Sequence, residues 1–312
     1  MKSFAIRTNN LTQDFKTVRA VDALTLDVPP GIIFGFLGPN GSGKTTTIRL
    51  LLGLLEPTSG KAEVLGFDTR TQASEIRERA GALLEHSGLY ERLSAEDNLD
   101  FYGQAWRMSA AARQARAKEL LGHVGLWERR KEIVGAWSRG MKQKLAVARA
   151  LFHRPALLFF DEPTAGLDPV AAAELREDLA KLTAQQGVTV FLTTHNLAEA
   201  EKLCQRVAVI RGGKLLTVGH PDDLRVASGS DGLHAEISGR GFNHQVIALL
   251  RARPEVTAVE LNNGRLCLNL KSNAELAPLI RLLVSQGAEV EEVRKGKASL
   301  EDVFLTLMEE EK

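Results

Sequence analysis

Cysteine is scarce in this chain, with only Cys204 and Cys267 among its 312 residues. Two thiols so far apart in the sequence give no disulfide framework, which favours a reducing compartment. Long apolar runs are missing as well, since none approaches the roughly 18 residues that span a bilayer. The N-terminal segment MKSFAIRTNNLTQDF lacks the apolar core of a signal peptide. We therefore expect a cytoplasmic chain that reaches any membrane process through a partner.

An excess of one charge is also absent. The 40 Lys and Arg residues nearly balance the 39 Asp and Glu residues, for a formal net charge of +1. Such a balance creates no overall field that would attract nucleic acid, so we expect no nucleic-acid partner. The length allows two domains and a large core.

The most informative feature present is a phosphate-binding loop. Residues 38–45, GPNGSGKT, match the P-loop pattern G-x-x-x-x-G-K-[ST]. Glycines let such a loop fold tightly around an anion and point backbone N–H groups at phosphate oxygens. Lys44 can reach the β- and γ-phosphates, and the Thr45 hydroxyl can bind Mg²⁺. The predicted cofactor-binding residues are Gly38, Pro39, Asn40, Gly41, Ser42, Gly43, Lys44, Thr45 and Thr46.

The flanking sequence suits this loop. Residues 32–37, IIFGFL, form a short apolar run that predicts a buried strand. Residues 45–55 predict a helix, whose positive N-terminal end would face the phosphates. The guanine-recognition sequence N-K-x-D does not occur, so ATP rather than GTP is the expected nucleotide.

A second part of a nucleotide site follows later in the chain. Residues 156–160, ALLFF, predict a buried strand that ends in Asp161 and Glu162, at the edge where parallel sheets bind ligands. Asp161 could hold Mg²⁺ through its water shell. Glu162, the next residue on an extended chain, would point another way and could orient or deprotonate the attacking water. An acidic turn after a strand is common, and the P-loop upstream is what favours a catalytic pair.

Three further motifs complete an ordered set. WSRGMKQ occupies residues 137–143, AGLD follows at residues 165–168, and Thr193-Thr194-His195 comes after the apolar run 188–192. Together with the P-loop and the strand acids, this set resembles the nucleotide-binding subunits of ABC transporters. The resemblance covers about residues 4–220.

The resemblance implies a mechanism shared between two copies of the chain. In that family, two nucleotide-binding domains pair head to tail, and each ATP lies between the P-loop of one and the signature motif of the other. Ser138 and the backbone N–H of Gly140, at the start of a predicted helix, would contact the γ-phosphate across the interface. Asp168 would couple the two sites.

The same resemblance assigns roles within one copy. His195 would contact the γ-phosphate and help to hold Glu162 and the water in place, so Glu162 and His195 are the predicted catalytic residues. Phe15 lies where the family places an aromatic ring that stacks on adenine. A lone histidine is more often structural, but a position after a buried strand, at the edge that carries Lys44 and Asp161, favours a functional role.

Two motifs depart from the family pattern. Arg139 stands where the signature usually has its first glycine, and Met141 stands where it usually has glutamine. Glu85 stands where the Q-loop glutamine is usual, which makes it a candidate Mg²⁺ ligand. A carboxylate there could bind the metal more firmly or repel the γ-phosphate. A shift of the alignment by one residue would bring His86 to this position instead.

The predicted fold class is α/β, a P-loop NTPase of the ABC nucleotide-binding type with an α-helical subdomain and a small α+β, ferredoxin-like C-terminal domain. The nucleotide-binding domain is predicted at residues 1–222, with the helical subdomain at about 88–155 and a β-hairpin over 207–218. An accessory domain is predicted at residues 223–312.

The accessory domain has its own pattern. After a link at 228–232, the sequence predicts a strand near 233–238, a helix near 243–252, a hairpin over 262–264, a helix near 273–286 and a strand near 288–294. This order suggests a ferredoxin-like domain, and a helix over 300–308 closes the chain. It shows no catalytic constellation, so a dimerisation or stabilising module is favoured over a ligand sensor.

Three functions fit these motifs. The first is the ATP-hydrolysing subunit of an exporter of drugs, lipids or polysaccharides, bound to a second copy and to a membrane permease at the inner face of the plasma membrane. The second is a soluble ABC ATPase of DNA repair or translation, against which the single P-loop and the lack of a long heptad insertion argue. The third is a regulatory nucleotide-binding module without turnover, which Glu162 and His195 disfavour. In an exporter, an apolar cluster would dock the permease. The alternative is that these side chains pack the core of the helical subdomain. The cluster consists of Leu89, Tyr90, Phe101 and Tyr102.

Overall fold

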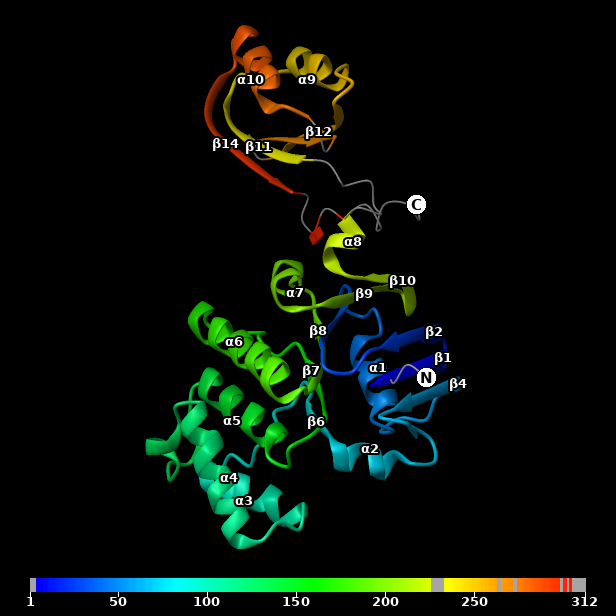
Figure 1. Cartoon of the computed structure of the whole chain (residues 1–312), viewed down its shortest axis with the longest axis vertical. Helices are drawn as coiled ribbons and strands as arrows, with labels where there is room; N and C mark the ends of the chain where they lie inside the picture. Colours follow the sequence, from blue (N-terminus) through cyan, green and yellow to red (C-terminus); the bar gives the residue numbers. More distant parts are fainter. Residues whose placement is uncertain are drawn as a thin grey trace. The chain divides into compact units, whose positions relative to one another are not determined.

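The protein is described by a computed structural model that covers residues 4–225, 233–262, 265–271, 274–297, 300–301 and 303–304. Figure 1 traces the chain through its helices and strands. The chain divides into two compact units, Met1–Val218 and Gly219–Lys312. Each unit has a hydrophobic core of its own.

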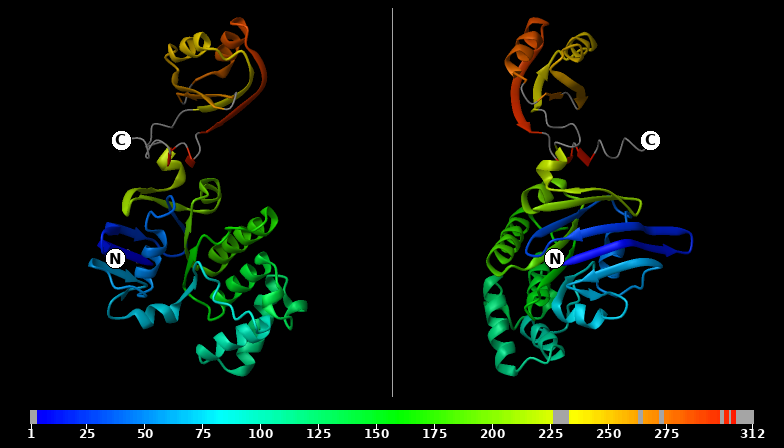
Figure 2. Two further views of the ribbon diagram at one scale, coloured as in Figure 1. Left: turned by 180° about the vertical axis from the view of Figure 1, so that it is seen from behind. Right: turned by 45° about the vertical axis from the view of Figure 1, so that its right-hand side comes forward.

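The first unit begins with an antiparallel sheet. β1 (Ile6–Phe15) and β2 (Val18–Val28) form a long hairpin, and β4 (Ser59–Val64) and β5 (Phe67–Asp68) extend the sheet in the order β2-β1-β4-β5 (Figure 2). Buried residues alternate with exposed ones over much of β2 and β4. This period of two directs one face of the sheet to the core.

A second, six-stranded sheet positions the candidate site. Its order is β10-β9-β3-β8-β7-β6, and its central strands pair in parallel. Parallel strands present their carboxyl ends at one edge, so the residues that follow β3, β7 and β8 lie close together. The neighbouring strands β9 and β10 confirm the predicted hairpin. The strands are β3 (Ile33–Leu37), β6 (Ala80–Leu83), β7 (Leu157–Asp161), β8 (Thr189–Thr194), β9 (Arg206–Arg211) and β10 (Lys214–Gly219).

Helices cover both faces of this sheet. α1 (Lys44–Leu51) packs between the two sheets, where it contacts β2, β4 and β7. α6 (Pro169–Gln186) lies on the opposite face against β3 and β8 (Figure 1). Two short helices are added to these: α7 (Leu197–Leu203) contacts β3, and α2 (Ala73–Arg79) contacts β5 and β6.

The helix after the P-loop is shorter than the sequence predicts. A helix is expected over 45–55, but α1 ends at Leu51. Gly53 adopts a φ of +61°, and the N–H of Leu54 donates to the carbonyl of Arg49 at 2.9 Å. This left-handed glycine and its hydrogen bond are a Schellman motif, which stops a helix. The prediction was therefore wrong over its last turn.

A helical subdomain is inserted between β6 and β7. It contains α3 (Ala95–Ala105), α4 (Ala110–His123) and α5 (Arg139–Leu151), with short 3₁₀ turns η1 (Trp127–Arg129) and η2 (Val134–Ala136). Each α-helix begins at a serine whose side chain accepts a backbone N–H in the first turn. The three helices pack around an apolar cluster of their own. The predicted α-helical subdomain is therefore confirmed.

One polar ring is half-buried where this subdomain joins the sheet. His153, just after α5, stacks on Trp106 with ring centroids 4.0 Å apart. Its Nε2 lies 3.2 Å from the Ala80 carbonyl oxygen, whereas its buried Nδ1 finds no hydrogen-bond partner among the described residues. Burial, with a smaller contribution from the charges of Arg149 and Arg116, lowers the pKa of the imidazole to about 4 against the opposing effect of the Ala80 hydrogen bond.

We expect His153 to make the free energy of unfolding fall as pH drops from about 6.5 to about 4. The pKa in the folded protein is about 4, below the ordinary 6.5, so the unfolded chain binds the proton more tightly in this window. The loss should reach about 2 kcal/mol after a discount for partial exposure. Denaturant titrations across this pH range should show a smaller loss of unfolding free energy for His153→Gln, because glutamine cannot titrate. An identical pH dependence for both proteins would contradict this assignment.

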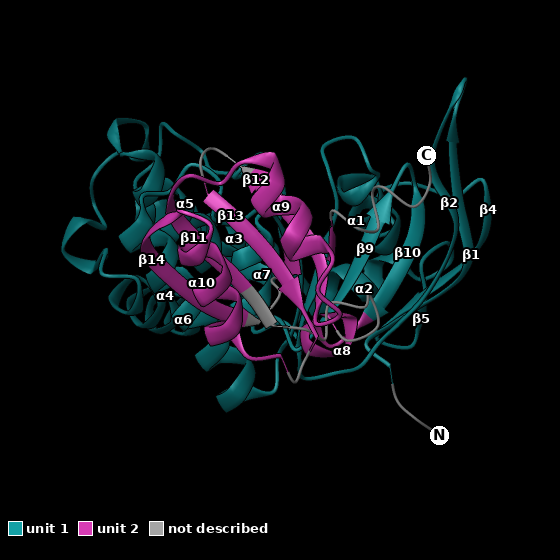
Figure 3. Cartoon of the chain, turned by 90° about the horizontal axis from the view of Figure 1, so that it is seen from above, with its two compact units in different colours: residues 1–218 teal, residues 219–312 magenta. Residues whose placement is uncertain are grey.

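The second unit is a small α+β domain, coloured magenta in Figure 3. Its antiparallel sheet has the order β12-β13-β11-β14, and α9 and α10 contact β12 and β14. This is the ferredoxin-like arrangement, and the predicted alternation of strands and helices is confirmed. The elements are α8 (Pro221–Arg225), β11 (Leu233–Arg240), α9 (His244–Arg251), β12 (Val256–Asn262), β13 (Arg265–Leu270), α10 (Leu276–Ser285) and β14 (Glu289–Lys297).

Three predictions for this unit lie wholly or mostly outside the described residues. They are the link at 228–232, the turn at 263–264 and the closing helix over 300–308.

Candidate nucleotide-binding site

The P-loop connects β3 to α1 and lines a pocket of about 420 Å³. Gly43 shows why the loop needs glycine, because its φ is +100° and a Cβ would collide with the carbonyl oxygen of Ala20. Ala20 and Val18 belong to β2, so the antiparallel sheet forms one wall. The remaining lining residues are Asn40, Gly41, Lys44, Thr45, Thr46, Leu84, Glu85, Arg139, Gln143, Asp161, Glu162 and Ala165.

The ammonium group of Lys44 lies inside the loop. Its Nζ donates to the carbonyls of Gly38 at 2.8 Å and Pro39 at 3.1 Å, and it lies 3.5 Å from Glu162 Oε1. Only 7% of the lysine side chain is exposed. A nearly buried cation held in place by loop carbonyls is suited to bind the phosphates of a nucleotide.

Ser42 contributes an unsatisfied hydroxyl to the same loop. The residue is buried, and within the described part of the chain its Oγ has no hydrogen-bond partner. Buried polar atoms are almost always hydrogen-bonded, so an exception calls for a partner. A phosphate oxygen beside the loop would supply one, and the P-loop residues therefore fit an anionic ligand.

Oxygen ligands gather where β7 ends. Thr45 Oγ1 donates to Asp161 Oδ2 at 2.5 Å, and Thr193 Oγ1 donates to Asp161 Oδ1. Asp161 and Thr193 are paired across the parallel strands β7 and β8. A hydroxyl and a carboxylate, completed by water and phosphate oxygens, are the ligands that Mg²⁺ prefers. Thr45 and Asp161 therefore fit a magnesium ion.

Glu162 occupies the centre of the candidate site. Its Oε2 lies 2.8 Å from His195 Nδ1, and its Oε1 faces Lys44. The chain was expected to be extended at Glu162, but φ is +50°, in the left-handed region. Its N–H lies 3.1 Å from both the carbonyl oxygen and the hydroxyl oxygen of Thr193, which hold this uncommon conformation. The expectation of an extended chain was wrong, although the side chain does point away from Asp161 toward His195.

The residues predicted at the edges of the pocket lie as follows. Glu85 is exposed and lines the pocket, whereas His86 is not among the residues that line it. Phe15 is 45% exposed at the end of β1, and it pairs with Val18, which lines the pocket. Arg139 also lines the pocket, a position that the sequence did not predict.

The signature residues gather in a different hollow of about 300 Å³. Ser138 caps α5 by accepting the N–H of Met141, and Gly140 follows in the first turn. Asp168 caps α6, and the N–H groups of Ala171 and Val170 hold the pKa of its carboxyl below the ordinary value. The structure thus brings the predicted residues of the signature motif and of the 165–168 motif to one surface. The hollow is lined by Val124, Gly125, Leu126, Arg129, Ser138, Gly140, Met141, Lys144, Asp168 and Ala171.

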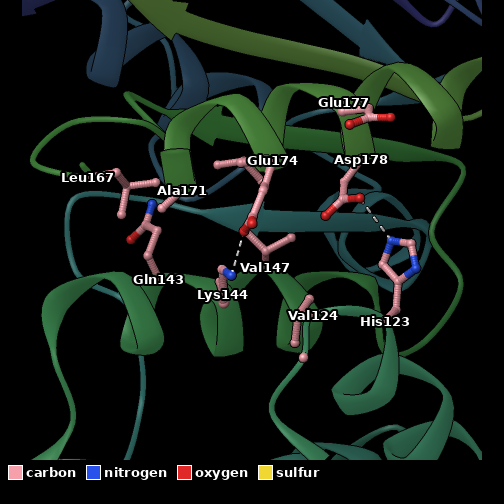
Figure 4. Close-up of a pocket in the computed structure, with 12 residues that line it drawn as sticks. His123, Val124, Gln143, Lys144, Val147, Leu167, Ala171, Glu174, Glu177 and Asp178 are labelled. Atoms are coloured by element: carbon pink, nitrogen blue, oxygen red, sulfur yellow. Dashed lines mark hydrogen bonds and ion pairs between the residues drawn. The ribbon is translucent and has the colours of Figure 1, made fainter. Parts of the chain in front are cut away.

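A third hollow of about 230 Å³ separates α6 from the helical subdomain (Figure 4). Lys144 of α5 reaches across it to Glu174 at 2.7 Å, and His123 of α4 reaches Asp178 at 3.2 Å. Gln143 lines both this hollow and the P-loop pocket. The sequence pattern did not predict these cross-links, because they depend on the distance between helices that lie far apart in the chain.

Comparison with known proteins places this arrangement in a family. The family model for ABC transporters matches residues 21–165. The bacitracin transport ATP-binding protein BcrA of Bacillus licheniformis is 35% identical over 306 residues, 98% of this chain and 98% of that protein. This chain belongs to the ABC transporter ATP-binding proteins. The daunorubicin/doxorubicin resistance ATP-binding protein DrrA of Streptomyces peucetius is 34% identical to this ABC protein over 305 residues, 97% of this chain and 92% of that one.

Solved structures agree with this assignment of the ABC protein. The ATP-binding subunit of an ABC transporter is 31% identical, with a TM-score of 0.67 over 72% of this chain and 93% of that one. The dimeric cassette MJ0796, in a post-hydrolysis state with ADP and Pi, is 26% identical, with a TM-score of 0.64 over 69% of this chain and 98% of that one. The predicted ABC-type P-loop fold is confirmed, and the protein is an ATP-binding ATPase subunit.

None of the helices in the described residues combines the length and the hydropathy that crossing a bilayer requires.

Proposed function

We propose that this ABC protein hydrolyses ATP with Glu162 as general base and so drives export of a drug-like molecule through a membrane permease. The observation that carries the proposal is the Glu162 carboxylate, which faces Lys44 on one side and His195 on the other. The relatives that serve bacitracin transport and daunorubicin resistance support a drug-like substrate.

Each residue of one copy has a distinct task in this mechanism. Lys44 and the N–H groups of the P-loop bind the phosphates, and Thr45 and Asp161 hold Mg²⁺. When bound, the ion supplies positive charge beside the β- and γ-phosphates. Glu162 orients the attacking water or takes its proton, and His195 fixes the direction of the Glu162 carboxylate.

The other predicted contacts complete the nucleotide site. Phe15, exposed at the rim opposite Val18, would stack on adenine through its free face. Glu85 has an acidic oxygen within the same pocket, where it would act on Mg²⁺ or on the γ-phosphate.

A second copy of the chain would complete the catalytic machinery. The P-loop pocket and the signature hollow have no lining residue in common. Ser138 and Gly140 would therefore reach the γ-phosphate bound to a partner placed head to tail, where the N-terminus of α5 offers free N–H groups. The dimeric state of the MJ0796 cassette supports this arrangement. Asp168, in the same hollow, would couple the two sites.

An exposed aromatic surface is suited to dock the permease. Tyr90 and Phe101 are each 46% exposed, with ring centroids 4.7 Å apart, and Tyr102 lies against both. The buried Asn98 holds the loop through hydrogen bonds of 2.8 and 3.0 Å to the backbone of Tyr90. Leu89, in contrast, packs against the apolar cluster of the helical subdomain. Binding at this surface would hold the ABC protein at the cytoplasmic face of the plasma membrane.

We expect the double change Tyr90→Glu and Phe101→Glu to release the protein from a permease-containing membrane. Two charges would have to be buried in an apolar contact, so membrane-bound protein should fall by about tenfold or more, and transport with it. The affinity of the isolated protein for ATP should stay unchanged, because neither residue lines the nucleotide pocket. Membrane flotation, substrate uptake into vesicles and calorimetry measure these three quantities.

Leu54→Glu is the matched control for this experiment. Leu54 is 54% exposed and follows α1, away from the helical subdomain in the sequence. This control should float with the membranes as the native protein does. If the double variant also remains bound and transports at the native rate, the docking surface lies elsewhere.

A further inference from the structure

Two residues that break the family pattern lie in the wall of one pocket. Glu85 follows β6 and Arg139 begins α5, yet both line the P-loop pocket. Neither side chain makes a hydrogen bond or an ion pair with any described residue. Two opposite charges thus face the nucleotide pocket without a partner of their own.

The Arg139 side chain is directed to the pocket of its own chain by close packing. Its guanidinium lies against Gly166, where φ is +73° and where a Cβ would collide with that guanidinium. Gln143, one helical turn later on the same face of α5, donates from Nε2 to the carbonyl of Pro163 at 2.6 Å. This face of α5 therefore rests on the segment that follows Glu162. Figure 4 shows Gln143 beside Leu167 at the edge of the neighbouring hollow.

The loop that carries Glu85 is tied to the same helix. Lys142 on α5 pairs with Glu91 at 2.7 Å, and the N–H of Gly135 donates to the Glu91 carbonyl at 2.8 Å. These contacts hold the loop and the start of α5 together. Glu85 and Arg139 therefore lie on two segments that are connected to each other.

The two departures together leave the net charge of the pocket unchanged. Three carboxylates, Glu85, Asp161 and Glu162, line it together with two cations, Lys44 and Arg139. With the family's usual glutamine and glycine at the two unusual positions, two carboxylates would face one cation, which is the same net charge. Glu85 alone would add one negative charge beside the phosphates of ATP, and a like charge weakens anion binding.

We infer that Arg139 is a nucleotide-pocket cation that acts on the ATP of its own chain and offsets the carboxylate of Glu85. The inference rests on the proposed nucleotide site and assigns Arg139 a role in the same chain, in addition to the signature contacts proposed across a dimer. Both residues line the same pocket as Glu162, the proposed general base for the γ-phosphate, so we expect their effects to be larger on ATP than on ADP.

The test measures ATP affinity by calorimetry in dilute, metal-free solution, with the monomer verified by sedimentation. Glu85→Gln should tighten ATP binding by about tenfold, the effect of removing one like charge at a separation of roughly 6 Å in an effective dielectric of roughly 40. Arg139→Gln should weaken it by about tenfold for the opposite reason. The double variant should return to within about threefold of the native affinity, and the changes for ADP should be smaller.

Three variants control for effects other than pocket charge. Lys61→Gln and Glu63→Gln remove exposed charges from β4, and neither residue lines the pocket, so both should bind ATP as the native protein does. Arg139→Lys keeps the charge and should remain within about threefold of the native affinity.

Several outcomes would overturn the inference. Native ATP affinity in Arg139→Gln would mean that this guanidinium does not act on the pocket, and a double variant as weak as Arg139→Gln alone would mean that it does not offset Glu85. An effect that emerges only at concentrations where the protein dimerises would place Arg139 on the partner's nucleotide. Lys44→Ala separates the two levels: if it also binds ATP normally, the proposed nucleotide site itself fails.

Discussion

Glu162→Gln is expected to bind ATP with near-native affinity and to lose ATP turnover by about a hundredfold or more. The amide has the size of the carboxylate, so the loop around Lys44 and His195 can keep its shape. It cannot take a proton from water, and it orients the attacking water less well. Loss of the negative charge also removes a competitor for Lys44, which lies 3.5 Å from Glu162 Oε1, so binding should not weaken.

The variant should also accumulate as an ATP-bound dimer, because the dimer would separate only after hydrolysis. Phosphate release with Mg²⁺ and ATP measures turnover, and sedimentation with ATP measures the dimer. Glu174→Gln is a matched control, since Glu174 pairs with Lys144 at 2.7 Å and lines a hollow distinct from the P-loop pocket. A native rate of hydrolysis in Glu162→Gln would assign water activation to another residue.

The parts of the site that the sequence predicted are those encoded by short contiguous segments. A P-loop between strand and helix, and Asp161 at the end of an apolar run, each depend on local order alone. If the short apolar strands are taken to be parallel, their carboxyl ends fall at one edge of the sheet. The structure indeed brings Thr45, Asp161 and Glu162 into one pocket.

The parts that escaped prediction depend on register or on contacts across the chain. Thr193 supports both Asp161 and the N–H of Glu162, but this follows only from the pairing of β7 with β8. The left-handed backbone at Glu162 likewise results from those contacts, and no local pattern encodes it. Arg139 reaches the pocket because its guanidinium packs on Gly166, a contact between segments that no spacing rule connects.

One error had a signal in the sequence. The helix predicted to continue to residue 55 stops because Gly53 takes the left-handed position after the last turn, where glycine is strongly preferred. The prediction extended the helix because the residues after Gly53 are apolar, and it gave no role to the glycine. Periodicity gave the correct type of element, and capping chemistry decided its end.

Lys44→Ala is expected to weaken ATP binding by about a hundredfold, which corresponds to about 2.7 kcal/mol. The ammonium group is the nearly buried cation of the P-loop, and charge-assisted hydrogen bonds to phosphate are among the strongest that proteins make. Without it, Glu162 faces the phosphates with no positive charge between them. Calorimetry with ATP, with and without Mg²⁺, measures the loss.

The fold should survive this change, because the partners of the Lys44 ammonium among the described residues are two loop carbonyls and Glu162, and Lys44 belongs to none of the apolar clusters. The midpoint of thermal unfolding without nucleotide should therefore stay near the native value, whereas the extra stability that ATP confers should disappear, since stabilisation by a ligand follows its affinity. Lys61→Ala, an exposed position on β4, should lose neither property. Unchanged ATP affinity in a folded Lys44→Ala protein would remove the P-loop from the binding site, and with it every proposed phosphate contact.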